Sequence, residues 1–136
     1  MLDNTDLRIL DELSKNSRIS MKELGEKIHL SGPAASARVE KLEDSGIIES
    51  YTIKVNQQNL GYPIHAMISI LTSSKDHAPY LTFLKTQTDF VINNYKISGD
   101  SCYLLECKFP SNEVLDEFLI NLNTHVNYKL SLVIAK

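Results

Sequence analysis

Two basic side chains, Arg38 and Lys41, stand three residues apart in a charged amphipathic segment. This spacing puts them one turn apart on a helix, on a flank away from the apolar Val39 and Leu42. Guanidinium and ammonium groups in such positions neutralise nucleic-acid phosphates, so we interpret both as candidate phosphate contacts. Lys22, near the start of the preceding helical segment, is a third candidate. From the residues alone, solvated surface charges that bind nothing are the favoured interpretation, and phosphate contact is preferred only together with the fold pattern described below.

Small residues come just before these two cations, at the start of the same helical segment. They are Ser31, Gly32, Pro33, Ala34, Ala35 and Ser36. Backbone N–H groups at a helix start bind phosphate, the hydroxyls form hydrogen bonds, and alanine methyl groups contact thymine. None of these side chains forms the paired hydrogen bonds that discriminate strongly between bases. We therefore expect a relaxed sequence preference, with affinity that depends on phosphates, DNA shape and multivalent assembly.

The overall charge does not favour nucleic-acid binding by itself. The chain of 136 residues has a net charge of −3, and residues 1–55 contain eight Lys/Arg against ten Asp/Glu. Contact with DNA must therefore come from a local surface and from assembly, because the chain is not a polycation.

Residues that could do catalysis or bind a metal are present but scattered. The histidines are His29, His65, His77 and His125. None belongs to a pattern of a nucleophile with a paired carboxylate, and no glycine-rich phosphate loop is present. Cys102 and Cys107 are five apart in one strand-like segment, so they point to opposite faces and do not bridge within it. We expect no catalytic site, no cofactor and no metal site.

The start of the chain is acidic and amphipathic, which resembles neither a secretory signal nor a transit peptide. No apolar run approaches the roughly 18 to 20 residues that span a bilayer. The sequence therefore predicts a cytoplasmic protein with no membrane partner.

Three helices are expected in the first 46 residues. The first covers about Asp3 to Lys15, with Asp3 as its N-cap. The second begins with a capping box at Ser20, and the third begins at Ser31 and ends at Gly46. Two short helices joined by a tight turn form a helix-turn-helix pattern, which the first helix would pack against.

A strand is expected from Ile47 to Val55, followed by a connecting segment, Asn56 to Pro63. From Ile64 onward the pattern alternates between strands and helices in the order βαββαβ, which is typical of a ferredoxin-like sandwich. One face of that sheet takes the two helices. The other face also contains apolar residues, which indicates that another subunit packs against it. They include Leu71, Leu104 and Val133.

This order of elements resembles the Lrp/AsnC family, the leucine-responsive or feast/famine transcriptional regulators. The resemblance rests on three segments in the right order: "LDNTDLRILDELSKNSRISMKELGEKIHLS", "RVEKLEDSGIIESYT" and "SGDSCYLL". It implies an α+β fold with a winged-type helix-turn-helix and a ferredoxin-like domain of the RAM type. The corresponding parts are residues 1–50 for DNA binding, 51–63 as strand and linker, and 64–136 for effector binding and oligomerisation.

The resemblance also implies partners: double-stranded DNA, a homodimer formed through the C-terminal domains, and assembly into a tetramer of dimers. It further implies an amino-acid effector site, which would include Gly99, Asp100, Ser101 and Cys102. The family commonly has an aspartate where this chain has Cys102. That difference weakens the case for an ordinary amino-acid ligand.

Three alternatives stay open at the level of sequence. One is an architectural, nucleoid-type DNA-binding protein without an effector. The second is a small-molecule sensor that has lost DNA binding. The third is an enzyme or an attached regulatory subunit, which the scattered histidines disfavour.

Overall fold

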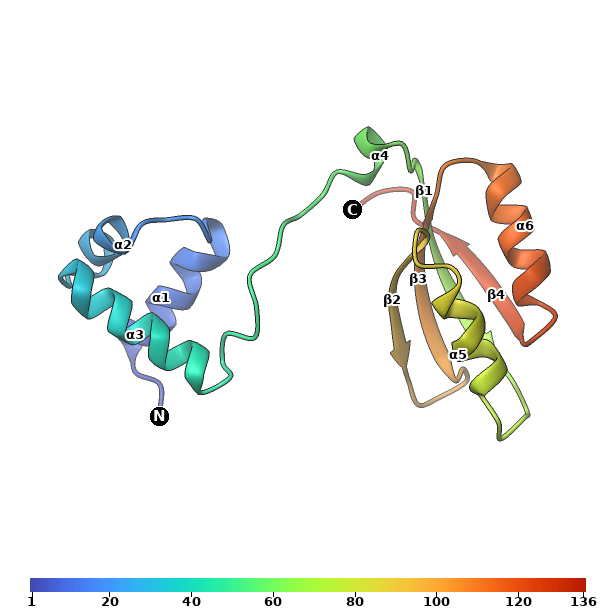
Figure 1. Cartoon of the computed structure of the whole chain (residues 1–136), viewed down its shortest axis with the longest axis horizontal. Coiled ribbons are helices and arrows are strands. Elements are labelled where there is room, and N and C mark those ends of the chain that lie inside the picture. The colour runs from blue at the N-terminus through green and yellow to red at the C-terminus, as the bar shows by residue number, and fades with distance from the viewer. The chain divides into compact units, whose positions relative to one another are not determined.

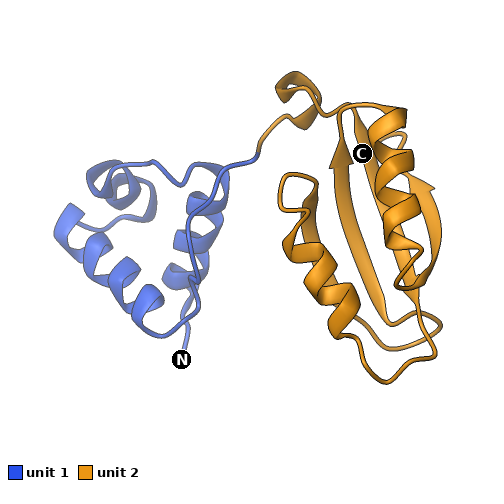
Figure 2. Cartoon of the chain, turned by 45° about the vertical axis from the view of Figure 1, so that its right-hand side comes forward, with its two compact units in different colours: residues 1–54 blue, residues 55–136 orange.

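The computed structural model describes residues 1–136, which fall into two units, Met1–Lys54 and Val55–Lys136. Figure 1 shows the elements in chain order and Figure 2 colours the two units. Each unit has its own buried core, so each is described by itself. None of the helices combines the length and the apolarity that crossing a membrane requires.

The N-terminal unit consists of three helices, α1 (Asn4–Lys15), α2 (Met21–Ile28) and α3 (Gly32–Asp44). Apolar residues at helical spacing form one core between them, as the sequence predicts. The buried members are Ile9, Leu13, Ile19, Leu24, Ile28, Ala35, Val39 and Leu42. This core fixes α3 against α1 and α2 along the Ala35, Val39 and Leu42 stripe.

The ends of these helices follow the expected capping chemistry, with one difference. Asp3 and Asp6 form a complete capping box at α1. Ser20 accepts a hydrogen bond from the Glu23 N–H at 3.1 Å, but the return bond of the expected capping box is not formed. At the far end of α3, Gly46 has φ 79°, a left-handed conformation that suits glycine and ends the helix.

The strand expected from Ile47 to Val55 is wrong for the single chain. Residues 49–55 are exposed and belong to no sheet. Apolar and polar residues do alternate along this segment, as in a strand. Its apolar members Tyr51, Ile53 and Val55 are nevertheless exposed, at 48%, 80% and 40%. A strand also needs a neighbour to receive its backbone hydrogen bonds, and the N-terminal unit contains no other strand.

The C-terminal unit begins with a one-turn helix, α4 (Gln57–Leu60), where a connecting segment was expected. Its four strands and two further helices then follow in the predicted βαββαβ order. They are β1 (Ile64–Leu71), α5 (Ala78–Lys85), β2 (Val91–Lys96), β3 (Tyr103–Phe109), α6 (Asn112–Leu122) and β4 (Asn127–Leu132). The strands lie in the order β2-β3-β1-β4 with every neighbouring pair antiparallel. This confirms the ferredoxin-like α+β fold.

Helices α5 and α6 pack on one face of this sheet (Figure 1). The buried residues of β1 alternate along the strand as Ala66, Ile68 and Ile70, which is the period of a strand with one covered face. In α5, Tyr80 and Leu84 are buried, whereas Leu81 is 39% exposed. Leu81 therefore lies on the outer side of the helix.

Neither α5 nor α6 lies on the opposite face of the sheet. Tyr95, Leu104 and Ser69 lie in register across β2, β3 and β1 on this face. Tyr95 is 50% exposed and Leu104 is half-buried. With Met67 and Leu71, these side chains form a mixed apolar surface, which we call the open sheet face.

Candidate nucleic-acid interface

The turn between α2 and α3 is tight because a glycine lies beneath it. The Leu30 N–H donates a hydrogen bond to the Gly25 carbonyl at 2.9 Å. A β-carbon on Gly25 would lie 2.5 Å from the Leu30 carbonyl oxygen. Between them, His29 ends α2 in a left-handed conformation, with φ 62° and ψ 41°. The chain therefore reverses direction within a few residues and holds α3 close to α2.

The start of α3 lies beside the start of α2, so the turn brings predicted contact residues together. The Ser31 hydroxyl accepts a hydrogen bond from the Ala34 N–H at 3.2 Å and caps the helix. A β-carbon on Gly32 would lie 3.5 Å from the Cα of Lys22. Ser31, Gly32 and Lys22 thus form one contiguous surface.

The exposed side of α3 changes character along the helix. Pro33, Ala37, Glu40 and Asp44 are all exposed, and their spacing puts them in one row. The row is uncharged in its first half and acidic in its second. Ser36 is also exposed, whereas Ala35 is fully buried and Ala34 is half-buried. Along this row, the first two turns of α3 can therefore approach an anionic surface without repulsion from the helix's own carboxylates, and beyond them the flanking Lys41 supplies a positive charge.

Arg38 is bound within the unit by two carboxylates of α1. Its Nη1 atom lies 2.6 Å from Asp3 Oδ2 and 3.2 Å from Asp6 Oδ1. The other oxygen of each carboxylate closes the capping box: Asp3 Oδ1 accepts from the Asp6 N–H at 2.8 Å, and Asp6 Oδ2 from the Asp3 N–H at 3.1 Å. The Asp6 N–H and the Arg38 guanidinium together lower the pKa of the Asp3 carboxyl. All four carboxylate oxygens therefore have partners.

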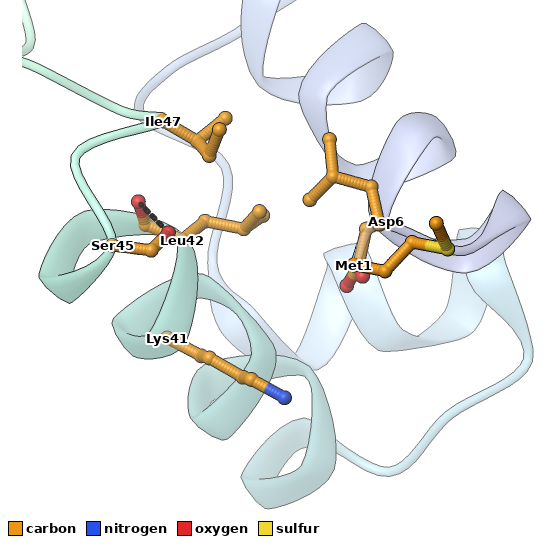
Figure 3. Close-up of a pocket in the computed structure, with 7 residues that line it drawn as sticks. Met1, Asp6, Lys41, Leu42, Ser45 and Ile47 are labelled. Carbon is orange, nitrogen blue, oxygen red and sulfur yellow. Dashed lines mark hydrogen bonds between the residues drawn. The ribbon is translucent and has the colours of Figure 1, made fainter.

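Lys41 lies beside this ion-pair cluster, at the rim of a pocket of about 190 Å³ between α1 and the end of α3. Figure 3 shows Met1 and Asp6 on one side of the pocket and Lys41, Leu42, Ser45 and Ile47 on the other. Lys41 is exposed and forms no ion pair. Its ammonium group is therefore available to an external anion.

Other cations of this unit also divide into those that have a partner within the unit and those that have no carboxylate partner. Arg8 donates a hydrogen bond to the Lys27 carbonyl at 2.7 Å, and the Lys27 ammonium lies 3.9 Å from Glu12. Lys22 and Arg18 are exposed and have no carboxylate partner. No group of three His, Cys, Asp or Glu side chains is arranged to hold a metal ion.

Comparison with known proteins identifies the class of regulator. Residues 2–49 match the family described as winged helix-turn-helix DNA-binding. Over 136 residues the chain is 62% identical to the HTH-type transcriptional regulator LrpA of Bacillus subtilis, with 100% of each chain covered. The chain belongs to the Lrp/AsnC family. It is a DNA-binding transcriptional regulator of this type, as its sequence predicts.

Solved structures agree with this Lrp/AsnC assignment. The structure of LrpC from Bacillus subtilis is 33% identical, with a TM-score of 0.93 over 100% of this chain and 96% of that chain. A transcriptional regulator of Neisseria meningitidis in complex with L-methionine is 26% identical, with a TM-score of 0.90 over 100% of this chain and 92% of that chain. These relatives are transcriptional regulators and none of them is described as an enzyme.

The expected effector residues of this Lrp/AsnC chain lie in the C-terminal unit, at the turn between β2 and β3. Gly99 has φ 125°, which explains the glycine at this turn, and Asp100 is exposed. Cys102 is held by its backbone, because its N–H donates to the Ile70 carbonyl at 2.8 Å and its carbonyl accepts from the Ile97 N–H at 3.1 Å. Ser101 is half-buried between them.

The two cysteines of this region differ in environment. Cys102 is half-buried, and its thiol lies 3.6 Å from the Thr72 carbonyl. Cys107 is fully buried on the helix-covered face, and burial raises the pKa of its thiol to about 12. Both are free, which agrees with the prediction that they do not bridge.

Three features of this Lrp/AsnC chain were missed by reasoning from the sequence. The first is Gly25, whose position inside a helical pattern was itself the available signal. The second is the binding of Arg38 by Asp3 and Asp6, residues more than thirty positions away that no local pattern connects. The third is a pair on the open sheet face, where His65 Nε2 lies 2.6 Å from Glu106 Oε2.

Proposed function

We propose that this regulator binds duplex DNA through the first two turns of α3, with Lys22 and Lys41 contacting phosphates on either side. The proposal rests on the tight α2–α3 turn, which places the start of α3 beside Lys22: a β-carbon on Gly32 would lie 3.5 Å from the Lys22 Cα. In helix-turn-helix proteins the start of the second helix approaches the base edges. Here that start consists of Ser31, Gly32, Pro33, Ala34 and Ser36.

We also propose that sequence preference is relaxed. The exposed side chains in the first two turns are small, so they form no bidentate hydrogen bonds with base edges. Farther along, Glu40 and Asp44 repel the phosphate backbone. Affinity would then come mainly from phosphate contacts, DNA shape and several DNA-binding units acting together.

The phosphate contacts are tested by measuring DNA affinity over a salt series for Lys22→Ala and Lys41→Ala in the full chain. Each lost phosphate contact should reduce the slope of log K against log salt by about 0.9. Lys75→Ala is the matched control, because Lys75 is exposed in the C-terminal unit, outside the proposed interface. Unchanged slopes for both variants would reject these contacts.

We propose a homodimer in which two open sheet faces meet, and further assembly into a tetramer of dimers. The support is the apolar group of Met67, Leu104 and Tyr95 on this face, which also carries the polar pair His65 and Glu106. Apolar side chains on a sheet face without a packed helix favour contact with another subunit. The tetramer of dimers follows from family resemblance.

An effector response is a further proposal, centred on Gly99, Asp100, Ser101 and Cys102. The Neisseria meningitidis relative is described as an L-methionine complex, which supports an amino-acid ligand for this fold. Cys102 lacks the carboxylate that would hold an amino group, which argues against an ordinary amino acid. Calorimetry with the twenty amino acids distinguishes these outcomes. If none of the amino acids binds, an architectural DNA-binding protein without an effector is favoured.

We also propose that this regulator acts in the cytoplasm, because its proposed partner is DNA.

A further inference from the structure

We propose that Arg38 is a positioning residue of the DNA-binding unit, which fixes the start of α1 against α3 and does not bind phosphate itself. This role differs from the phosphate contact expected from its place on α3. The inference rests on DNA binding by the α2–α3 pair, as proposed above.

The hydrogen-bond pattern is the first support. Asp3 and Asp6 each use one oxygen to close the capping box of α1 and the other to bind Arg38 Nη1. Rotating the guanidinium toward DNA would break two charge-assisted hydrogen bonds at once. It would also leave two neighbouring carboxylates without their shared cation, and these would repel each other.

Burial is the second support. The Asp6 side chain is 13% exposed and that of Arg38 is 35% exposed. A partly buried carboxylate that loses its cation is destabilised more than a fully hydrated one, because solvent screens it less. Both carboxylates hold Arg38: the outer Asp3, whose side chain is 54% exposed, makes the shorter contact, and Asp6 makes the more buried one.

Incomplete packing beside the cluster is the third support. The pocket next to Asp6 and Lys41 separates the first residues of the chain from the end of α3. Met1 and Leu2, which line it, are themselves exposed, so apolar contacts hold this end of α1 weakly. The contacts of Arg38 with Asp3 and Asp6 bridge the two helices where the core does not.

The charge balance has a consequence for DNA. One guanidinium between two carboxylates gives the cluster a net charge of −1, so it cannot attract phosphate. Among the cations of α3, only Lys41 then remains for the DNA backbone. Arg38 instead sets the direction in which α3 presents Ser31 to Ala37.

The test compares Arg38→Gln with the unmodified full chain on a labelled duplex of mixed sequence, over a salt series at a temperature where both are folded. Positioning predicts an affinity loss of roughly three- to tenfold with an unchanged salt slope. A slope reduced by about one would mean that Arg38 binds a phosphate, and it would overturn the proposal. An unchanged affinity of the folded variant would mean a merely structural role and would also overturn it.

The DNA affinity and salt slope of Asp6→Asn supply a second measurement. For this variant, the positioning role and the phosphate-contact role predict different results. If Arg38 positions α3, removing the Asp6 charge leaves the salt slope unchanged and does not tighten binding beyond the control, because Asp3 still binds the guanidinium. If Arg38 were a phosphate ligand, losing one of its two carboxylate partners would tighten binding and steepen the slope. Asp11→Asn is the matched control, because it removes the same charge from α1 and breaks an exposed ion pair with Lys15.

If the single variants are unstable, a triple variant that restores DNA affinity tests the positioning role of Arg38. The variant Asp3→Asn, Asp6→Asn, Arg38→Gln keeps hydrogen-bonding groups at all three positions and removes the charges. Positioning predicts that it recovers much of the affinity lost by Arg38→Gln, whereas failure to recover affinity in the folded protein contradicts it. Absence of DNA binding by the unmodified chain would instead reject the proposed function on which this inference rests.

Discussion

The Leu30 carbonyl oxygen lies where a side chain on Gly25 would need to be: a β-carbon there would approach it to 2.5 Å. This relationship ties the sequence of α2 to the geometry of the turn that carries α3. Since the obstructing atom belongs to the backbone, the turn itself must shift to admit a methyl group.

We therefore expect Gly25→Ala to destabilise the N-terminal unit by about 1–3 kcal/mol, despite alanine's higher helix propensity. Hydrogen exchange of the amides in residues 1–54 measures this loss. Gly32→Ala is the matched control, because a β-carbon there meets its nearest atom at an ordinary 3.5 Å. Equal losses for the two variants would contradict this explanation of the turn.

His29 adopts a left-handed conformation that residues other than glycine adopt rarely. His29→Gly should stabilise the N-terminal unit by about 1 kcal/mol, because the β-carbon strain disappears. The melting temperature of the unit is the measurement. Ser45→Gly at the end of α3 is the control, since its right-handed backbone gives glycine no such advantage. A lower melting temperature for His29→Gly would oppose the prediction.

Glu106 makes the stability of the C-terminal unit depend on pH. Its carboxylate accepts a hydrogen bond from the Asn93 amide at 2.9 Å and lies 2.6 Å from the His65 ring, and these contacts lower its pKa below the ordinary 4.5. A carboxyl group with a lowered pKa in the folded state stabilises that state above its ordinary pKa. This stabilisation disappears as pH falls through the lowered value.

Urea unfolding of the C-terminal unit at a series of pH values tests this. Glu106→Gln should flatten the loss of stability below about pH 4.5. Glu113→Gln, an exposed carboxyl change on α6, is the control and should leave the profile unchanged. Identical acid profiles for Glu106→Gln and the unmodified chain would exclude this role.

The proposed dimer through the open sheet face makes a direct prediction. Leu104→Asp should weaken self-association by about a hundredfold or more, because an unpaired carboxylate would be buried between the sheets. Light scattering over a dilution series measures it. Ile120→Asp is the control, since Ile120 is 61% exposed on α6, which covers the other face. Loss of assembly in the control alone would place the interface elsewhere.

Much of the fold could be predicted because its signals are local. The Ser31 cap, the buried stripe of α3 and the βαββαβ order each follow from residues close together in sequence. The segment from Ile47 to Val55 was predicted wrongly for the complementary reason. Its alternation is local, but whether a strand forms depends on a neighbour that the N-terminal unit does not contain.

The candidate site was predictable in its components but not in their pairing. Residue type and spacing identify Arg38 and Lys41 as equivalent cations on one helix flank. In the fold they differ, because Asp3 and Asp6 reach Arg38 from α1 while Lys41 stays unpaired. Which of two equivalent charges is neutralised depends on how helices pack, and that is set by the core and not by the charges themselves.

The central claim is that α3 brings this regulator close to DNA without discriminating strongly between sequences. Binding titrations on a promoter fragment under its control and on a scrambled duplex, each over the same salt series, test it most directly. The account predicts steep salt dependence for both duplexes and a preference below about a thousandfold. A preference above about a thousandfold at physiological salt would contradict it, because the small side chains from Ser31 to Ala37 could not supply that discrimination.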